Sequence, residues 1–175
     1  FFEIAPFGVQ IDIEATAEPR VVLIEDVNLS SKTVPPGGSF DVEITLRPFR
    51  KEPVIQKMTL KVPPDAKGPC EVVVRGGGIE EPDQESIIMG WRTIQSLDEL
   101  LMEFSAMETN DEVVAEVRSF GPPGEDPESP EAEENQKKLR SQVKEESIKE
   151  GSFKSYRSNY YVDGLQRRMI RVVPE

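Results

Sequence analysis

The sequence predicts a mainly β fold, a β-sandwich of immunoglobulin-like type, with one packed α-helix and a disordered acidic insert. Short apolar runs of period two recur roughly every ten residues over 9–75, separated by proline- and glycine-rich turns, which is typical of a sandwich of half-buried strands. One apolar stripe at helical spacing follows. The segment Gly121–Glu150 is dominated by polar and charged residues and cannot build a core. The Cys-Trp-Cys pattern of antibody domains is absent.

The first two predicted strands differ in pattern. In Val9–Glu14, the side chains of Val9, Ile11 and Ile13 face one way and the polar residues face the other. Arg20–Asn28 contains four apolar residues in succession, which face both sides and indicate a central strand. Val9–Glu14 lies near the start of the sequence, so it is also a strand that a neighbouring copy could accept.

Three further strands follow, each bounded by residues that interrupt a sheet. They are Phe40–Leu46, Val54–Val62 and Cys70–Arg75. The turns Val34–Gly38 and Pro63–Pro69 separate them, because proline lacks an amide donor and glycine relaxes the backbone. This part of the chain, residues 1–78, is expected to supply most of the sandwich.

A helix is predicted to begin at Ser96. Ser96-Leu97-Asp98-Glu99 is a capping box, in which the serine hydroxyl accepts from the Glu99 amide and the glutamate reaches back. Apolar residues then recur over about three turns, at Leu97, Leu100, Leu101, Phe104 and Met107. We expect this stripe to pack on the sheet; the alternative is that it enters a partner's groove. A short strand at Val113–Val117 ends the second segment, 79–120.

The third segment, 121–152, is the acidic insert. We expect Gly121–Pro130 to be disordered, since its composition cannot offset chain entropy. Glu131–Glu150 has enough helix formers for a helix with a thin stripe at Leu139, Val143 and Ile148. The last segment, 153–175, returns to strand character, and its Asp163-Gly164 pair between apolar runs predicts a hairpin.

Composition excludes several function classes. The net charge of −12 argues against nucleic acid, whose binding depends on Lys and Arg. No apolar run is long enough for membrane insertion. The absence of histidine removes the commonest general base and zinc ligand. The single cysteine, Cys70, is interpreted as a small core residue rather than a nucleophile.

No residue pattern selects a catalytic, cofactor or metal site. The acids over 80–85 do not match the spacing of an EF-hand loop. Trp91, the only tryptophan, is expected at a core margin, with a partner anchor as the alternative. We therefore predict no catalytic residues, no cofactor and no metal. The candidate interaction residues are Val9, Ile11, Ile13, Trp91 and Phe104.

Several short motifs occur in an order that resembles a known family. They are Glu18-Pro19-Arg20, Val34-Pro35-Pro36-Gly37-Gly38, Leu46-Arg47-Pro48-Phe49-Arg50, Leu60-Lys61-Val62-Pro63, Ser96-Leu97-Asp98-Glu99-Leu100 and Tyr160-Tyr161-Val162-Asp163-Gly164. In this order the chain resembles the C-terminal, non-catalytic region of exported bacterial proteins related to the SpoIVB serine peptidases. The catalytic His and Ser motifs of that family are absent from the sequence. The resemblance implies an extracytoplasmic companion of a peptidase-like domain and assigns no active-site residue.

Three functions follow as hypotheses. The first is a non-catalytic accessory or interaction domain that positions or regulates a neighbouring domain of the same polypeptide. The second is a structural subunit of the cell envelope or an extracellular filament, which assembles with copies of itself through strand edges. The third is a carboxylate-based hydrolase, for which no acid pair is selected by the sequence.

Overall fold

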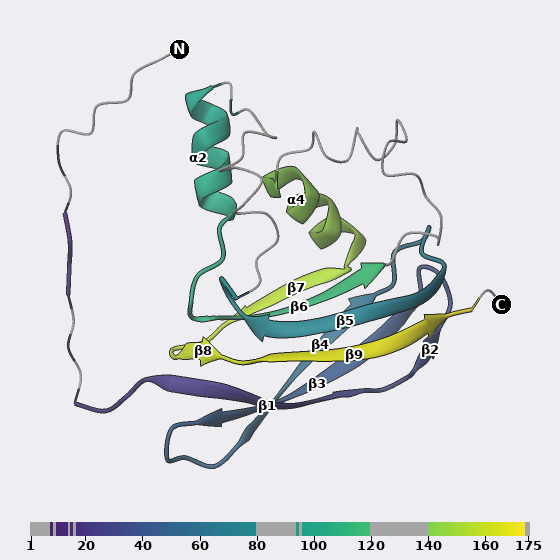
Figure 1. The fold of residues 1–175 in the computed structure, drawn as a ribbon, viewed down its shortest axis with the longest axis horizontal. Helices are drawn as coiled ribbons and strands as arrows, with labels where there is room; N and C mark the ends of the chain where they lie inside the picture. The colour runs from purple at the N-terminus through teal and green to yellow at the C-terminus, as the bar shows by residue number, and fades with distance from the viewer. Residues whose placement is uncertain are drawn as a thin grey trace.

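The fold is described from a computed structural model of the 175-residue chain, in which residues 8, 10–13, 15, 17–79, 94, 96–119 and 140–173 are described. These residues form a mainly β structure (Figure 1). Its strands are β1 (Val21–Leu29), β2 (Thr33–Val34), β3 (Ser39–Pro48), β4 (Val54–Lys61), β5 (Gly68–Gly76), β6 (Glu112–Ser119), β7 (Phe153–Arg157), β8 (Tyr161–Asp163) and β9 (Leu165–Val172). Its helices are α2 (Leu97–Ala106) and α4 (Arg140–Glu150).

The described strands make two sheets. The first sheet has the order β4-β3-β1-β8, and the second has the order β2-β9-β5-β6-β7. Neighbours are antiparallel except for two parallel pairs, β1 with β8 and β2 with β9. Both sheets therefore combine strands from the first 78 residues with strands from the C-terminal segment.

One hydrophobic cluster draws buried residues from both sheets. The period-two pattern predicted for β3 is confirmed, because Phe40, Val42, Ile44 and Leu46 are all buried. The face predicted for β4 is confirmed as well, at Met58, Leu60 and Val62. From the second sheet the cluster receives further side chains: Cys70, Val72, Val74, Val113, Ala115, Ile170 and Val172. Each large aliphatic side chain buried in this way contributes about 1.5–3 kcal/mol relative to exposure.

A bridge of side chains also joins the sheets. Arg168 in β9 donates from Nε to the Val27 carbonyl at 2.9 Å and from Nη2 to Asp26 Oδ1 at 2.9 Å, and both acceptors belong to β1. Asp26 lies where the β1–β3 register shifts. Asn28 Nδ2 donates to the other oxygen of the same carboxylate at 2.9 Å.

The predicted strand at Val9–Glu14 is not a strand over residues 10–13. Ile11 and Ile13 are 74% and 88% exposed, and no pairing is found for this segment among the described residues. Alternation alone does not make a strand, because a strand needs a partner edge for its backbone hydrogen bonds, and both sides of β1, the nearest strand in sequence, are taken by β3 and β8. Val9 and Glu14 themselves lie outside the described residues.

The predicted hairpin at Asp163-Gly164 is also wrong, although both flanking segments are strands. β8 pairs with β1 in the first sheet, whereas β9 pairs with β5 in the second. Gly164 has a φ of 110°, which only glycine adopts readily, and its carbonyl accepts from the Gly76 amide at 3.1 Å. The turn therefore carries the chain from one sheet to the other instead of folding it back.

Helix α2 begins where the capping box predicts. Ser96 is its N-cap, and its hydroxyl accepts from the Glu99 amide at 3.1 Å. The prediction that the apolar stripe packs on a sheet is wrong, because Leu97, Leu101 and Phe104 are exposed. The buried residue of this helix is Glu103. Among the described elements α2 packs mainly on α4, with Glu103 and the Ala106 carbonyl in hydrogen bonds to that helix.

Helix α4 lies within the predicted helical stretch Glu131–Glu150. It packs on β7 as well as on α2. Val143 and Ile148 are exposed, so these two residues of the expected apolar stripe are not on its buried face, and Leu139 lies outside the described residues. The predicted disorder at Gly121–Pro130 falls outside the described residues. Within the described part of the chain, no helix is long and apolar enough to cross a bilayer.

Candidate interaction surfaces

The structure separates the residues that the sequence marks for interaction. Val9 and Trp91 lie outside the described residues. Ile11 and Ile13 are on the exposed N-terminal segment, which runs apart from α2 in Figure 1. Phe104 lies on α2 and is 61% exposed. The three described candidates lie on two separate segments, so α2 is considered by itself.

The outer side of α2 carries an exposed apolar surface, which we call the α2 apolar face. Leu97, Leu101 and Phe104 recur at intervals of four and three residues, so they lie on one side of the helix. Met102 and Met107 flank them and are half exposed. Contiguous exposed apolar side chains of this kind mark interaction sites more often than isolated ones do.

Polar contacts explain why this face points outward. Glu103 Oε1 accepts from the Ser141 amide at 2.9 Å, in the first turn of α4, where the helix dipole favours a negative charge. Lys144 Nζ donates to the Ala106 carbonyl at 2.7 Å and lies 5.3 Å from the centroid of the Phe153 ring. These contacts commit the polar side of α2 to α4. The opposite side of the helix therefore faces away from it.

A groove runs between the two helices beside the α2 apolar face. It encloses about 300 Å³ and is lined by Met102, Ser105, Ala106, Ser141, Lys144, Glu145 and Ile148. Ile148 is half exposed, so one side of the groove is apolar. The groove extends the surface available on α2 toward α4.

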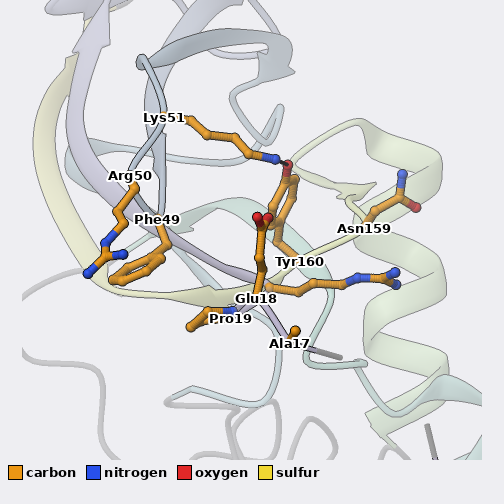
Figure 2. Close-up of a pocket in the computed structure, with 9 residues that line it drawn as sticks. Ala17, Glu18, Pro19, Phe49, Arg50, Lys51, Asn159 and Tyr160 are labelled. Carbon is orange, nitrogen blue, oxygen red and sulfur yellow. Dashed lines mark hydrogen bonds between the residues drawn. The ribbon is translucent and has the colours of Figure 1, made fainter. Parts of the chain in front are cut away.

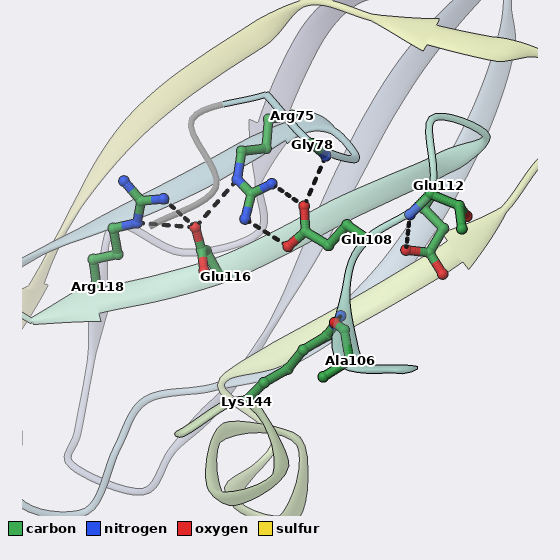
Figure 3. A network of polar contacts seen from close by, with 9 residues as sticks. Arg75, Gly78, Ala106, Glu108, Glu112, Glu116, Arg118 and Lys144 are labelled. Atoms are coloured by element: carbon green, nitrogen blue, oxygen red, sulfur yellow. Dashed lines mark hydrogen bonds and ion pairs between the residues drawn. The ribbon is translucent and has the colours of Figure 1, made fainter. Parts of the chain in front are cut away.

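A buried ionic network fixes the end of α2 to the second sheet (Figure 3). The guanidinium of Arg75, in β5, pairs with the carboxylate of Glu108, two residues after α2 ends. Glu116 Oε1 lies 3.4 Å from Arg75 Nε and also pairs with Arg118. The Gly78 amide donates to Glu108 Oε2 at 3.0 Å. Both carboxylates are thus held by guanidinium groups, which suits an anchor rather than an acid–base pair.

A second cavity, which we call the cationic groove, lies where β1 and β8 begin and β3 ends (Figure 2). It encloses about 630 Å³ and is lined by Ala17, Glu18, Pro19, Arg20, Phe49, Arg50, Lys51, Asn159 and Tyr160. Three of these side chains are cationic and one is anionic, in a chain of net charge −12. Sequence reasoning missed this site, because its three segments are distant in sequence and nothing in the sequence indicates that they meet.

Two kinds of chemical site can be checked in the described part of the chain: a reactive cysteine and a cluster of metal-binding side chains. Cys70 is fully buried in the core cluster, and burial raises the pKa of its thiol, which disfavours the nucleophilic thiolate. No group of three or more Cys, Asp or Glu side chains suited to a metal ion is found among the described residues. The acids over 80–85 lie outside them.

Comparisons of the chain with protein-family models, with curated proteins and with solved structures find no match. The α2 apolar face and the cationic groove are therefore interpreted from the chemistry of their own residues.

Proposed function

We propose that this chain is a non-catalytic interaction domain, and that the α2 apolar face contacts a neighbouring domain of the same polypeptide. The observation that carries this proposal is the exposure of Leu97, Leu101 and Phe104 on a helix whose other side is anchored to α4. An anchored helix loses little further entropy on binding, so its apolar side chains contribute more of their burial energy to affinity.

The chemistry of α2 also defines the partner. The first turn of the helix carries Asp98 and Glu99, and α2 has no basic residue. A complementary surface is an apolar groove with Lys or Arg side chains at its rim, which is the helix-in-groove mode of recognition. The resemblance to the C-terminal region of SpoIVB-related proteins supports a partner within the same polypeptide and an extracytoplasmic setting. An immunoglobulin-like sandwich formed by the two sheets is part of this proposal.

A photo-crosslinking amino acid at position 104 tests the proposal in the natural polypeptide. We expect crosslinks to a peptide of the same polypeptide outside residues 1–175. The matched control carries the same group at position 55, since Ile55 in β4 is as exposed as Phe104, at 61%. Crosslinks of equal yield from both positions, or none from position 104, would refute the assignment.

A second function, assembly of copies of this chain into an envelope or filament structure, is favoured by a different observation. Residues 10–13 are exposed and unpaired, with apolar side chains at alternate positions, and β4 forms an edge of the first sheet. Such a segment suits strand addition to an edge of a second copy. Light scattering tests this idea. Assembly is supported if the measured mass of the parent chain rises with concentration while the double variant I11S/I13S keeps the mass of a monomer. A parent chain that stays monomeric at all concentrations would exclude assembly.

The proposal includes an absence of turnover by the isolated chain. We expect no hydrolysis of peptide, ester or glycoside substrates and no labelling by serine-directed fluorophosphonates, because a serine here would need activation without histidine. The third hypothesis, a carboxylate-based hydrolase, would be favoured instead by glycoside turnover that a single Asp or Glu substitution abolishes.

A further inference from the structure

We infer that the cationic groove binds a carboxylate-bearing side chain of an acidic peptide segment, with Arg50 as its principal contact. This inference is independent of the α2 apolar face, since the groove is built from other segments: 17–20, the turn at 49–51, and 159–160. The hydrogen-bond donors and the aromatic rings that line the groove indicate which class of ligand it binds.

Arg50 stands in a conformation that its residue type disfavours. Its φ is 56°, and it is the one non-glycine residue with a positive φ among those described. The left-handed region is costly for a side chain with a Cβ, and residues held there against preference concentrate at functional sites. Glycine would adopt this conformation with less strain, so the arginine at this position indicates a role other than forming the turn.

The Arg50 guanidinium is positioned but not neutralised. Its carbon lies 5.0 Å from the centroid of the Phe49 ring, and no carboxylate within the described part of the chain forms an ion pair with it. Stacking on a ring face leaves the edge of the guanidinium and its paired N–H groups open. This planar fork matches the two oxygens of a carboxylate.

Lys51 and Tyr160 add further donors. Lys51 Nζ donates to the Tyr160 hydroxyl at 3.2 Å and lies 5.5 Å from the centroid of that ring. Because the tyrosine oxygen accepts this bond, its own O–H remains a donor, and the ammonium keeps two further N–H groups. Tyr160 is partly buried against the core, which fixes the ring. The groove thus holds a second group of donors, apart from the Arg50 guanidinium, which points away from them beside Phe49 in Figure 2. A peptide with two carboxylates can use both groups.

Backbone hydrogen bonds hold the groove in shape. The Phe49 amide donates to the Val21 carbonyl at 3.0 Å, and the Tyr161 amide donates to the Arg20 carbonyl at 2.7 Å. The Lys51 amide closes the turn onto the Pro48 carbonyl at 3.1 Å. The groove is therefore formed before a ligand arrives, which lowers the entropy cost of binding.

The occupant that best fits is a short peptide. A net charge of −12 repels polyanions such as duplex nucleic acid over long distances, whereas one or two carboxylates meet only the local cations. The exposed Phe49 ring provides an apolar wall for a neighbouring side chain. Glu18 also lines the groove and limits how much negative charge it accepts (Figure 2).

Fluorescence anisotropy tests the inference with a fluorescein-labelled hexapeptide amide, Gly-Glu-Phe-Glu-Ser-Gly, and its counterpart with glutamine at both glutamate positions. We expect the acidic peptide to bind at least about tenfold more tightly at low salt. Arg50→Gly should remove that difference without lowering the unfolding midpoint, because glycine accepts the left-handed conformation. Glu18→Gln should strengthen binding by roughly threefold through loss of like-charge repulsion.

The matched control is Arg47→Gln, which removes a cation from β3 outside the groove, where Arg47 pairs with Glu25. This variant should bind as the parent chain does. Equal binding of both peptides, or binding by Arg50→Gly at the parent level, would overturn the inference. Two further outcomes would overturn the inference by identifying a different ligand. One is complete displacement of the peptide by millimolar inorganic phosphate. The other is tighter binding of a single-stranded oligonucleotide than of the peptide.

Discussion

The buried guanidinium of Arg75 forms a bidentate ion pair with the carboxylate of Glu108, with 2.8 Å between Nη2 and Oε1. Neither side chain has appreciable exposure. The two residues are 33 positions apart, and the pairing joins the end of α2 to the end of β5, the central strand of the second sheet. Burial alone would lower the pKa of Arg75, but Glu108 and Glu116 outweigh it and the pKa is raised.

Removing the negative charge of Glu108 should leave the buried positive charge of Arg75 only partly compensated. We expect Glu108→Gln to lower the free energy of unfolding by about 3 kcal/mol in urea denaturation. The control is Glu25→Gln, which removes an exposed partner of Arg47 and should cost less than about 1 kcal/mol. Equal losses for the two variants would contradict a stabilising role for the buried pair.

The exposure of Phe104 predicts a small effect on stability. Phe104→Ala should change the free energy of unfolding by less than about 0.5 kcal/mol, since a surface truncation creates no cavity. Leu60→Ala, at a fully buried position of β4, should cost about 2–5 kcal/mol. A loss above about 2 kcal/mol for Phe104→Ala would show that its ring is covered in solution.

Cys70 should be unreactive in the folded chain. Its side chain is fully buried and burial raises the pKa of the thiol, so little thiolate is present and reagents cannot reach it. We expect the thiol reagent DTNB to react on the order of 100-fold more slowly in buffer than in guanidinium chloride. Comparable rates under the two conditions would place Cys70 at an accessible position.

Asp26 should make stability depend on pH in the acid range. The Val27 amide, Asn28 and Arg168 hold the pKa of Asp26 below its ordinary value of 3.8, with partial burial opposing them. A depressed pKa stabilises the folded state above the unfolded value and ceases to do so as the pH falls through the folded value. The difference in urea midpoint between the parent and Asp26→Asn should therefore be constant down to about pH 4 and shrink below it. A difference that persists unchanged to about pH 2 would contradict this assignment.

The crossing between the sheets should tolerate no side chain at Gly76. A Cβ there would lie 2.2 Å from the Val162 carbonyl oxygen, and backbone must move to admit it. We expect Gly76→Ala to lower the free energy of unfolding by roughly 1–3 kcal/mol. Gly8→Ala is the control, because a Cβ at Gly8 meets nothing within 4 Å. An unchanged midpoint for Gly76→Ala would mean that β5 and β8 do not approach so closely.

Features that depend on neighbours in sequence were predictable. The alternation in β3 and β4 and the cap at Ser96 follow from periodicity and local hydrogen bonding, and the structure contains them. The cationic groove and the Arg75 network were not predictable. Each depends on residues from separate turns and strands that meet only after the sheets pair.

By itself the sequence determined the mainly β character, which residues of β3 and β4 face the core, and where α2 begins. Only the tertiary structure decided what each element packs against. Residues 10–13 alternate like a strand yet pair with no described strand, because alternation defines a face and does not supply a partner edge. The α2 stripe is as apolar as a core face, yet it stays exposed because Glu103 and the Ala106 carbonyl bind α4. The physical reason is that periodicity defines a face, whereas the partner of that face depends on competition between segments far apart in the chain.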